Sequence, residues 1–444
     1  MPMQTPIVDF VRQYAERSAL RLHMPGHKGT GPLGAEALDL TEIEGADVLY
    51  HATGILRQSQ ENVARIFGTA KTLYSTEGSS LAIRAMLYLA VLFAKSMGKR
   101  PTILAARNAH KTFVTAAALL QIDVQWLMPS QEDTVLSCHI TPSALEEQLL
   151  KSKPTAVYLT SPDYLGNVAD IEALSQLCHK HGVLLLVDNA HGAYLRFVGR
   201  HPMQLGADLC CDSAHKTLPV LTGGAYLHIA KGAPGFFLEH ADLAMSIFAS
   251  TSPSYLILQS LDATNRYLSE GYEGRLAAFI AEAAQTKRRL SALGYRFLGE
   301  EPLKLTIATK SYGYTGDELA QHLTEQNIVC EFSDPDFLVL MLTPEVGEAG
   351  LERLETALAS IEHRQPIAVL PPKLPNPVRV MPMYEALTRE SRECPIVQCD
   401  GAVLAAPSVT CPPAVPILVC GERIDAQAIA CMEYYGIEKC RIVV

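Results

Sequence analysis

The 444-residue sequence predicts an α/β fold: a doubly wound, mainly parallel sheet in the larger part, followed by a smaller C-terminal α/β region. Short apolar runs recur between residues 100 and 230, and helix-like stretches separate them. Several runs are apolar at nearly every position, which is typical of strands buried on both faces. Hydrophobic residues make up 48% of the chain, enough for a large core. At roughly 150 residues per domain, the length favours two or three domains.

Six apolar runs are predicted strands: "PTILAA", "IDVQWLM", "TAVYLTSP", "VLLLVDNAHG", "ADLCCDS" and "GAYLHIA". The segment "IEALSQLCHKHG" lies between two of them, has helical spacing and is predicted to end at Gly182. In sheets of this kind, ligands bind at the carboxyl ends of the strands. The polar clusters "TSPDYLG", "DNAHG" and "DSAHK" fall at three such ends.

The rest of the chain divides into further segments. Residues 262–290 predict one long helix, because apolar positions recur at helical spacing. A proline-rich stretch can continue neither a helix nor a central strand, so it predicts a linker. The predicted segments are an N-terminal segment (1–60), a large domain (61–290), a small α/β domain (291–364), the linker (365–378) and a C-terminal segment (379–444).

Composition narrows the partners and the compartment. The net charge of -10 provides no basic face for nucleic acid. The N-terminus lacks a secretory signal and no run reaches the roughly 18 apolar residues that span a bilayer, so we expect a cytoplasmic protein without membrane contact. Six cysteines lie near the C-terminus. We expect them to be reduced thiols in the core that bind no metal, and disulfides or a metal site are the alternatives. The six cysteines are Cys394, Cys399, Cys411, Cys420, Cys431 and Cys440.

A candidate phosphate site precedes one strongly helical stretch. Gly78, Ser79 and Ser80 open this helix, so free backbone N–H groups and two hydroxyls would point to one spot at its positive end. The alternative is an ordinary serine N-cap. No Gly-Lys-Ser/Thr follows, so a Walker-type loop is excluded.

Two ionisable residues follow the run "VLLLV". Asp188 ends it, and an ionised carboxylate there is costly unless a cation or a strong donor faces it. A protonated pyridine nitrogen is one such partner. His191 lies three residues on and is either a polar contact at the same site or a capping histidine.

Lys216 lies in "CCDSAHKTLPVLTGG", where another predicted strand ends. A partly desolvated lysine amine can form a Schiff base with an aldehyde cofactor. An isolated lysine would be an ordinary surface charge. The order of a phosphate cradle, a strand-end aspartate and a strand-end Ser-x-His-Lys instead indicates pyridoxal 5'-phosphate (PLP).

Eight stretches resemble the ornithine/lysine/arginine decarboxylase family of fold type I PLP enzymes. Seven are "LHMPGHKG" (22–29), "TEGSSLAIRAM" (76–86), "RNAHKT" (107–112), "SPDYLGNVADIEAL" (161–174), "LLVDNAHGAY" (185–194), "GADLCCDSAHKTLPVLTGGAYLH" (206–228) and "TSPSYLILQSLDA" (251–263). The eighth, "CPPAVPILVCGERI" (411–424), is similar to the family's Pro-Pro-x-x-Pro signature. The resemblance implies an aspartate aminotransferase-like large domain that binds PLP and a C-terminal decarboxylase segment.

The resemblance also implies residue roles. Lys216 would carry the Schiff base, Asp188 would pair with the pyridine nitrogen, and His110 would stack on the cofactor ring. Phosphate contacts would come from Ser79, Ser80 and Ser213, with His215 adjacent, and from Ser250, Thr251 or Ser252 of a neighbouring subunit. The expected assembly is therefore a homodimer with shared active sites.

The implied reaction is decarboxylation of lysine, arginine or ornithine to the amine and CO2 through Schiff base exchange at Lys216, a step of polyamine biosynthesis. Another PLP reaction, such as aminotransfer or aldol cleavage, and a non-catalytic PLP-binding regulator remain alternatives. A hydrolase using Ser213, His191 and Asp188 is disfavoured, because no Gly-x-Ser-x-Gly surrounds Ser213.

Two departures from the family pattern stand out. Position 77 is Glu where the family often carries Asn. The chain also begins close to the family's core, so we expect the N-terminal wing domain of larger members to be absent. The residue that meets the substrate's distal cation is not identified, and the candidates are Glu44, Asp47, Glu77 and Glu385.

Overall fold

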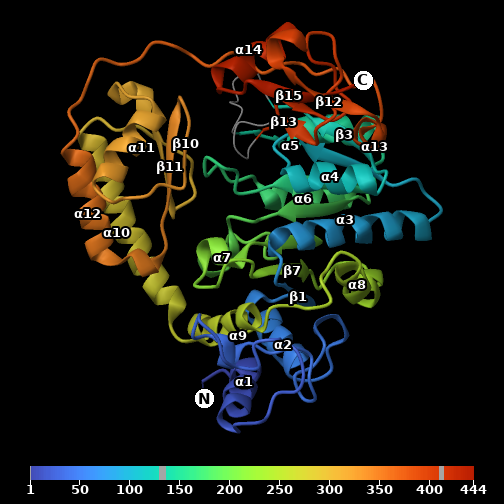
Figure 1. Cartoon of the computed structure of the whole chain (residues 1–444). Coiled ribbons are helices and arrows are strands. Elements are labelled where there is room, and N and C mark those ends of the chain that lie inside the picture. The colour runs from blue at the N-terminus through green and yellow to red at the C-terminus, as the bar shows by residue number, and fades with distance from the viewer. Residues whose placement is uncertain (1, 130–136, 410–414) are drawn as a thin grey trace. The chain divides into compact units, whose positions relative to one another are not determined.

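The computed structural model describes residues 2–129, 137–409 and 415–444 (Figure 1). The chain forms two compact units that interleave along the sequence. The first unit comprises Met1–Pro101, Ser152–Val157 and Ile171–Gly274. The second comprises Thr102–Lys151, Tyr158–Asp170 and Arg275–Val444.

A seven-stranded sheet has the order β1-β7-β6-β5-β4-β2-β3. Its strands are β1 (Lys71–Ser75), β2 (Thr102–Ala106), β3 (Asp123–Leu127), β4 (Ala156–Thr160), β5 (Leu184–Asp188), β6 (Leu209–Asp212) and β7 (Ala225–Ile229). All six predicted runs form strands, whereas β1 was not predicted. The pairs β2/β3 and β5/β6 are parallel, and β7 runs antiparallel to both β1 and β6. The prediction of a mainly parallel sheet is thus confirmed, with β7 as the antiparallel strand.

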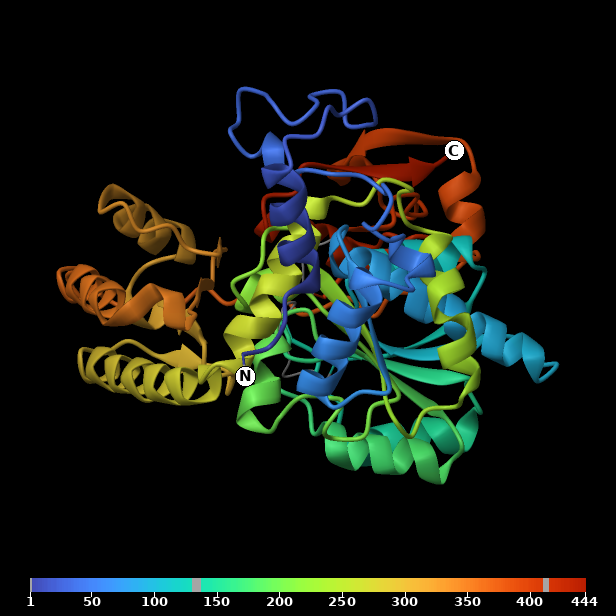
Figure 2. The ribbon, with the colours of Figure 1, turned by 90° about the horizontal axis from the view of Figure 1, so that it is seen from below.

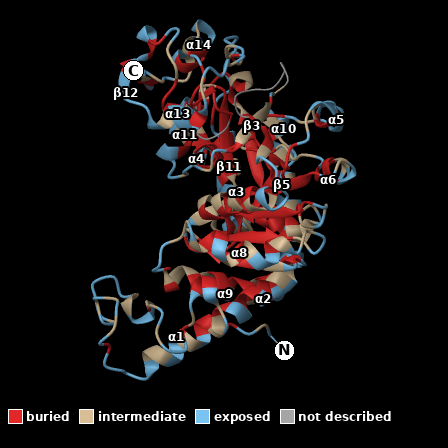
Figure 3. Cartoon of the chain, turned by 90° about the vertical axis from the view of Figure 1, so that its right-hand side faces the viewer, coloured by how far each residue is buried: buried red, intermediate tan, exposed pale blue. Residues whose placement is uncertain are grey.

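Helices of the first unit bury apolar faces against these strands and one another. They are α1 (Pro6–Glu16), η1 (Glu36–Leu38), η2 (Leu49–His51), α2 (Ile55–Phe67), α3 (Gly78–Ser96), α6 (Ile171–Lys180), η3 (Ala193–Val198), α7 (Ala214–Thr217), α8 (Phe236–Ser246) and α9 (Tyr255–Ser269). As predicted, α6 ends just before Gly182, whose positive φ of 68° suits glycine. Helices α1, α2 and α9 pack together (Figures 1 and 3).

Helix α3 is, among the described helices, the one that is long and apolar enough to cross a membrane. It packs against α8, β6 and β7, and more than half of its residues are buried in the protein. It is therefore best explained as a core helix, and Figure 3 shows buried residues along it and along the strands of the sheet.

The second unit contains a four-stranded antiparallel sheet of order β10-β11-β9-β8 and two small two-stranded sheets. Its helices are α4 (Lys111–Leu119), α5 (Pro142–Lys151), α10 (Tyr272–Ala292, which begins in the first unit), η4 (Thr309–Tyr312), α11 (Gly316–Glu325), η5 (Pro344–Val346), α12 (Gly347–Ala359), α13 (Met383–Thr388), η6 (Ile396–Gln398) and α14 (Ala426–Tyr434). Its further strands are β8 (Phe297–Leu298), β9 (Lys304–Ala308), β10 (Phe332–Ser333), β11 (Phe337–Met341), β12 (Ser391–Pro395), β13 (Ser408–Val409), β14 (Leu418–Val419) and β15 (Lys439–Val443). Helices α10 and α12 lie side by side in Figure 2, joined by an ion pair between Arg289 and Glu355.

The prediction of one helix over residues 262–290 is wrong. Helix α9 ends at Ser269 and α10 begins at Tyr272. Between them Gly271 has a φ of 74°, a left-handed conformation that interrupts a right-handed helix. Residues 362–378 contain neither helix nor strand, which agrees with a linker over 365–378.

The described cysteines are free thiols, as the prediction of reduced cysteines expects. Cys394, Cys399, Cys431 and Cys440 lie in one apolar cluster of the C-terminal segment. The first four residues of the signature 411–424, which include Cys411, lie outside the described residues.

Candidate active site

Two parallel strands of the first unit, β5 and β6, end beside each other. Asp188 ends β5, is 2% exposed and lies opposite Cys211 of β6. Its Oδ1 accepts hydrogen bonds from the Ala190 N–H at 3.2 Å and from the Cys211 Sγ at 3.5 Å. Burial, and then the charge of Asp188, raises the pKa of the Cys211 thiol well above its usual range, so this thiol stays a donor. The carboxylate is thus held in place with little water around it.

Lys216 lies in the short helix α7, which follows β6. Its Nζ is 3.0 Å from the Nε2 of His191, a residue only 7% exposed. The structure therefore brings together two of the predicted residues, and Lys216 is partly buried rather than a free surface charge. At this distance an imidazole can exchange a proton with an amine.

The N-terminus of α3 meets the loop after β6. The Oγ of Ser213 donates to the Oγ of Ser79 at 2.7 Å, and the Gly78 N–H donates to the Gly223 carbonyl at 2.7 Å. Gly223 has a φ of 100°, and a Cβ there would approach the carbonyl oxygen of Thr76 to 2.8 Å. Gly78 has a φ of 71°, and a Cβ on it would meet no protein atom within 4 Å. Two hydroxyls and open space therefore coincide at the N-terminus of a helix, which suits a phosphate group.

Glu77, the departure from the family pattern, binds a backbone group. Its Oε1 accepts a hydrogen bond from the Ser250 N–H at 2.7 Å, although Glu77 is the N-cap residue of α3 and makes no side-chain cap. The Glu77 carboxylate therefore does not cap α3. The Oγ of Ser250 in turn accepts from the Ser252 N–H at 3.1 Å, and Thr251 between them is exposed.

The two remaining histidines of the prediction have local partners. The Nδ1 of His215 is 3.0 Å from the Gly224 carbonyl. In the second unit, the Nδ1 of His110 accepts from the Thr112 N–H at 3.2 Å and so caps α4. The stacking of His110 on a cofactor ring stays a prediction.

Three of the four candidates for the distal cation already have partners, one of them Glu77 with its bond from the Ser250 N–H. The Asp47 carboxylate accepts four backbone N–H groups, which lower its pKa below the usual value although burial opposes them. Glu385 lies 3.3 Å from Arg389.

Sequence reasoning missed Asp212, the last residue of β6. Its carboxylate is fully buried and accepts hydrogen bonds from Asn189, His201 and His228. Burial alone would raise its pKa, but the two histidines lower it well below its ordinary value. The available signal was the one that identified Asp188, an aspartate at the end of an apolar run.

The contacts do not support the hydrolase alternative. Ser213 donates its hydroxyl proton to Ser79, and the Nε2 of His191 faces Lys216. In a serine hydrolase the histidine would instead face the serine hydroxyl.

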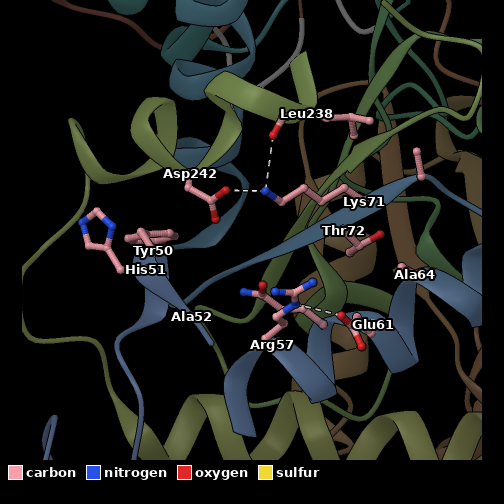
Figure 4. A pocket seen from close by; sticks show the side chains of 12 residues that line it. Tyr50, His51, Ala52, Arg57, Glu61, Ala64, Lys71, Thr72, Leu238 and Asp242 are labelled. Atoms are coloured by element: carbon pink, nitrogen blue, oxygen red, sulfur yellow. Dashed lines mark hydrogen bonds and ion pairs between the residues drawn. The ribbon is translucent and has the colours of Figure 1, made fainter. Parts of the chain in front are cut away.

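A separate cavity of about 530 Å³ in the first unit is lined by none of the predicted site residues (Figure 4). Its walls carry an ion pair between Lys71 and Asp242 and another between Arg57 and Glu61. These charges neutralise each other, so the cavity is a poorer candidate for the chemistry than the strand ends.

The residues at the strand ends fit PLP. A phosphate cradle at α3, a buried carboxylate at β5 and an amine at α7 are the three groups that its phosphate, ring nitrogen and aldehyde require. The charges of these protein groups also complement those of PLP. The anionic phosphate would face hydrogen-bond donors at α3, and the protonated ring nitrogen would face a carboxylate.

Comparison with known proteins agrees with this chemistry. The family model "Orn/Lys/Arg decarboxylase, major domain" matches residues 5–299. An arginine decarboxylase of Bacillus subtilis is 30% identical over 96% of this chain and 92% of its own length. An arginine decarboxylase of Halalkalibacterium halodurans is 29% identical with the same coverage. The solved structure of the Escherichia coli constitutive lysine decarboxylase has a TM-score of 0.78 at 18% identity, covering 99% of this chain and 82% of that one.

Proposed function

Because the chain belongs to the Orn/Lys/Arg decarboxylase family, it is a PLP-dependent decarboxylase of basic amino acids, and we propose that its substrate is arginine. The support is the relatives that match over almost their whole length. One of Bacillus subtilis and those of Halalkalibacterium halodurans and Bacillus cereus are named arginine decarboxylase, and a second one of Bacillus subtilis is named uncharacterized protein YaaO. The lysine decarboxylase LdcA of Pseudomonas aeruginosa is 23% identical over 63% of this chain.

The contacts described above support the following roles. Lys216 binds the cofactor aldehyde, and His191 at 3.0 Å takes the proton that the ammonium must lose before it can act as a nucleophile. The carboxylate of Asp188 keeps a proton on the ring nitrogen. PLP supplies an electron sink for the pair left when CO2 departs. Ser79, Ser213 and the N-terminus of α3 hold the phosphate.

We also propose a cytoplasmic homodimer acting in polyamine biosynthesis. Thr251 lies in an exposed loop that Glu77 holds through the Ser250 N–H. This loop is available to a partner's phosphate site. Light scattering is expected to give twice the 48.3 kDa mass of one chain, and a monomer with full activity would contradict shared sites.

A substrate panel tests the choice of arginine. CO2 release from arginine, lysine and ornithine is measured at several concentrations to obtain kcat/KM for each. We expect arginine to exceed the other two by about tenfold or more, because a site that pairs with a guanidinium leaves polar groups unpaired with an amine. A higher kcat/KM for lysine or ornithine would overturn arginine and leave the decarboxylase assignment intact.

A further inference from the structure

A chain of buried hydrogen bonds crosses four neighbouring strands of the first unit. Thr72 of β1 bonds His228 of β7 (Oγ1 to Nδ1, 2.8 Å), and the Nε2 of His228 lies 3.1 Å from the Oδ2 of Asp212 in β6. The Nδ2 of Asn189, the residue after β5, donates to the other oxygen of Asp212 at 2.7 Å. Each of these four side chains is at most 1% exposed. We call Thr72, His228, Asp212 and Asn189 the transverse chain.

The donors of the transverse chain converge on Asp212. The Nε2 of His201 adds a bond of 2.9 Å to Oδ2, and its Nδ1 accepts from the Met203 N–H, which assigns a neutral ring with the proton on Nε2. Burial lowers the pKa of His228, which favours the neutral ring, and its Nε2 lies 3.1 Å from the Asp212 Oδ2. Asp212 therefore carries one buried negative charge that is stabilised by oriented N–H donors.

A metal ion is an alternative explanation for this cluster, because donor atoms of His201, Cys210 and Asp212 lie within 4.8 Å of one another. Burial and the charge of Asp212 raise the pKa of the Cys210 thiol well above its usual range, whereas a metal needs the thiolate. The hydrogen bonds already satisfy Asp212 and His201 without an ion.

The transverse chain ends at the two strand ends that carry the site. Asn189 directly follows Asp188, and its N–H donates to the Cys211 carbonyl at 2.9 Å. Asp212 directly precedes Ser213, whose carbonyl accepts from the Lys216 N–H at 3.0 Å. Helix α7 has only four residues and no side-chain cap, so it cannot fix its own position. Thr72, at the other end of the transverse chain, lines the cavity of Figure 4.

We propose that Asp212 is a positioning residue that holds the ends of β5 and β6 in register, so that Asp188 and Lys216 can engage the same PLP molecule. The physical reason is that a buried carboxylate with several oriented donors has one favourable arrangement, and both strand ends are part of it. This inference rests on the proposed roles of Asp188 and Lys216.

The test compares Asp212→Asn with a control at the other end of β6. Asp208 is also buried, and its Oδ2 accepts from the Leu185 N–H at 2.8 Å and lies 3.1 Å from the Nε2 of His179. Asp208→Asn therefore removes a similar buried charge without touching the site. The PLP dissociation constant and the pH midpoint of the bound PLP absorbance are measured for both variants, and their Tm is measured without PLP.

We expect D212N to weaken PLP binding by about tenfold, the scale of one buried polar group losing its partner, and to shift the pH midpoint. D208N lowers Tm but leaves both PLP readouts near wild type. If the two variants change the PLP readouts equally, Asp212 is merely structural and the proposal is wrong. If D212N does not fold, Asn189→Ala replaces it, because it removes only the link to β5; unchanged PLP readouts in N189A would then refute the proposal.

Wild-type protein treated with PLP and borohydride separates this result from the proposed roles. Mass spectrometry should locate the reduced adduct on Lys216. An adduct elsewhere would refute the role of Lys216 itself, whereas an adduct on Lys216 together with equal effects of D212N and D208N refutes only the positioning role.

Discussion

The amine of Lys216 and the imidazole of the buried His191 are 3.0 Å apart, which is a suitable setting for a nucleophilic lysine. We expect Lys216→Ala to lose CO2 release by several orders of magnitude, on the order of 10³-fold or more, as when a covalent catalyst is removed. Lys71→Ala is the matched control, because Lys71 also lies partly buried in the first unit but pairs with Asp242.

Borohydride trapping reports the same assignment without turnover. K71A should retain the covalent PLP adduct, and K216A should not. Appreciable CO2 release or a trapped adduct in K216A would show that another amine holds the cofactor.

Residues near the site differ in how well the sequence predicted them. Asp188 directly follows an apolar run, so the local pattern predicted it as a candidate, whereas Lys216 lies five residues after Cys211 and was predicted from the order of the motifs and the family resemblance. Asp212 has the same local signal, but its partners His201 and His228 lie in other parts of the chain, and pairing across strands is not a local property. The bond from Glu77 to the Ser250 N–H was unpredictable for the same reason.

At the level of elements, the turn between β10 and β11 contains a buried acid. Asp334 is 3% exposed, and its Oδ1 accepts from the N–H groups of Asp336 and Phe337. Burial, with the nearby charges of Asp336 and Asp317, raises its pKa to about 7 despite these bonds. The folded protein thus favours protonated Asp334 more than the unfolded chain does.

The stability should therefore depend on pH through this turn. A raised pKa in the folded state contributes stability below the ordinary aspartate value of 3.8, and this contribution is lost as pH rises toward about 7. Asp334→Asn keeps the accepting oxygen and cannot ionise. Urea unfolding at pH 5 and pH 8 should show a loss for wild type, at most about 3 kcal/mol, that is absent in D334N. Equal pH slopes would contradict this.

Element prediction succeeded where strands are continuously apolar. All six such runs form strands, from β2 to β7. Their pattern does not encode direction, so the antiparallel β7 could not be recognised. Strand β1 was missed because its residues 71–75 mix polar and apolar types. The break at Gly271 was missed because the apolar spacing continues through it.

At the level of the whole molecule, two family-like stretches meet in the second unit. Arg107 of "RNAHKT" donates two hydrogen bonds of 2.7 Å to Glu422 of "CGERI", and both side chains are nearly fully buried. Arg107 also lies over the Trp126 ring at 5.0 Å. The C-terminal signature is thereby tied to residues at the start of this unit, 315 positions earlier.

Removing one partner of this pair leaves the other charge buried. We expect Glu422→Ala to lower the free energy of unfolding by about 3–5 kcal/mol. Glu355→Ala breaks the half-exposed pair with Arg289 and should cost no more than about 1 kcal/mol. Both are measured by urea unfolding. Similar losses in the two variants would show that Arg107 finds another partner.

The overall fold follows from the sequence better than its division into units. The α/β class and the fold type I relationship are confirmed by the sheet and by the structural relatives. The predicted segment limits assume contiguous domains, whereas the second unit combines residues 102–151 and 158–170 with 275–444. Contacts such as that of Arg107 with Glu422 cannot be inferred from local composition.

The pair of Arg107 and Glu422 also has a consequence for synthesis. The ribosome makes Arg107 315 residues before Glu422. A nascent chain therefore carries an arginine whose burial must wait until Glu422 has been made. Chains released early, by a nonsense codon or a stalled ribosome, keep that site open and stay recognisable to proteases as unfinished.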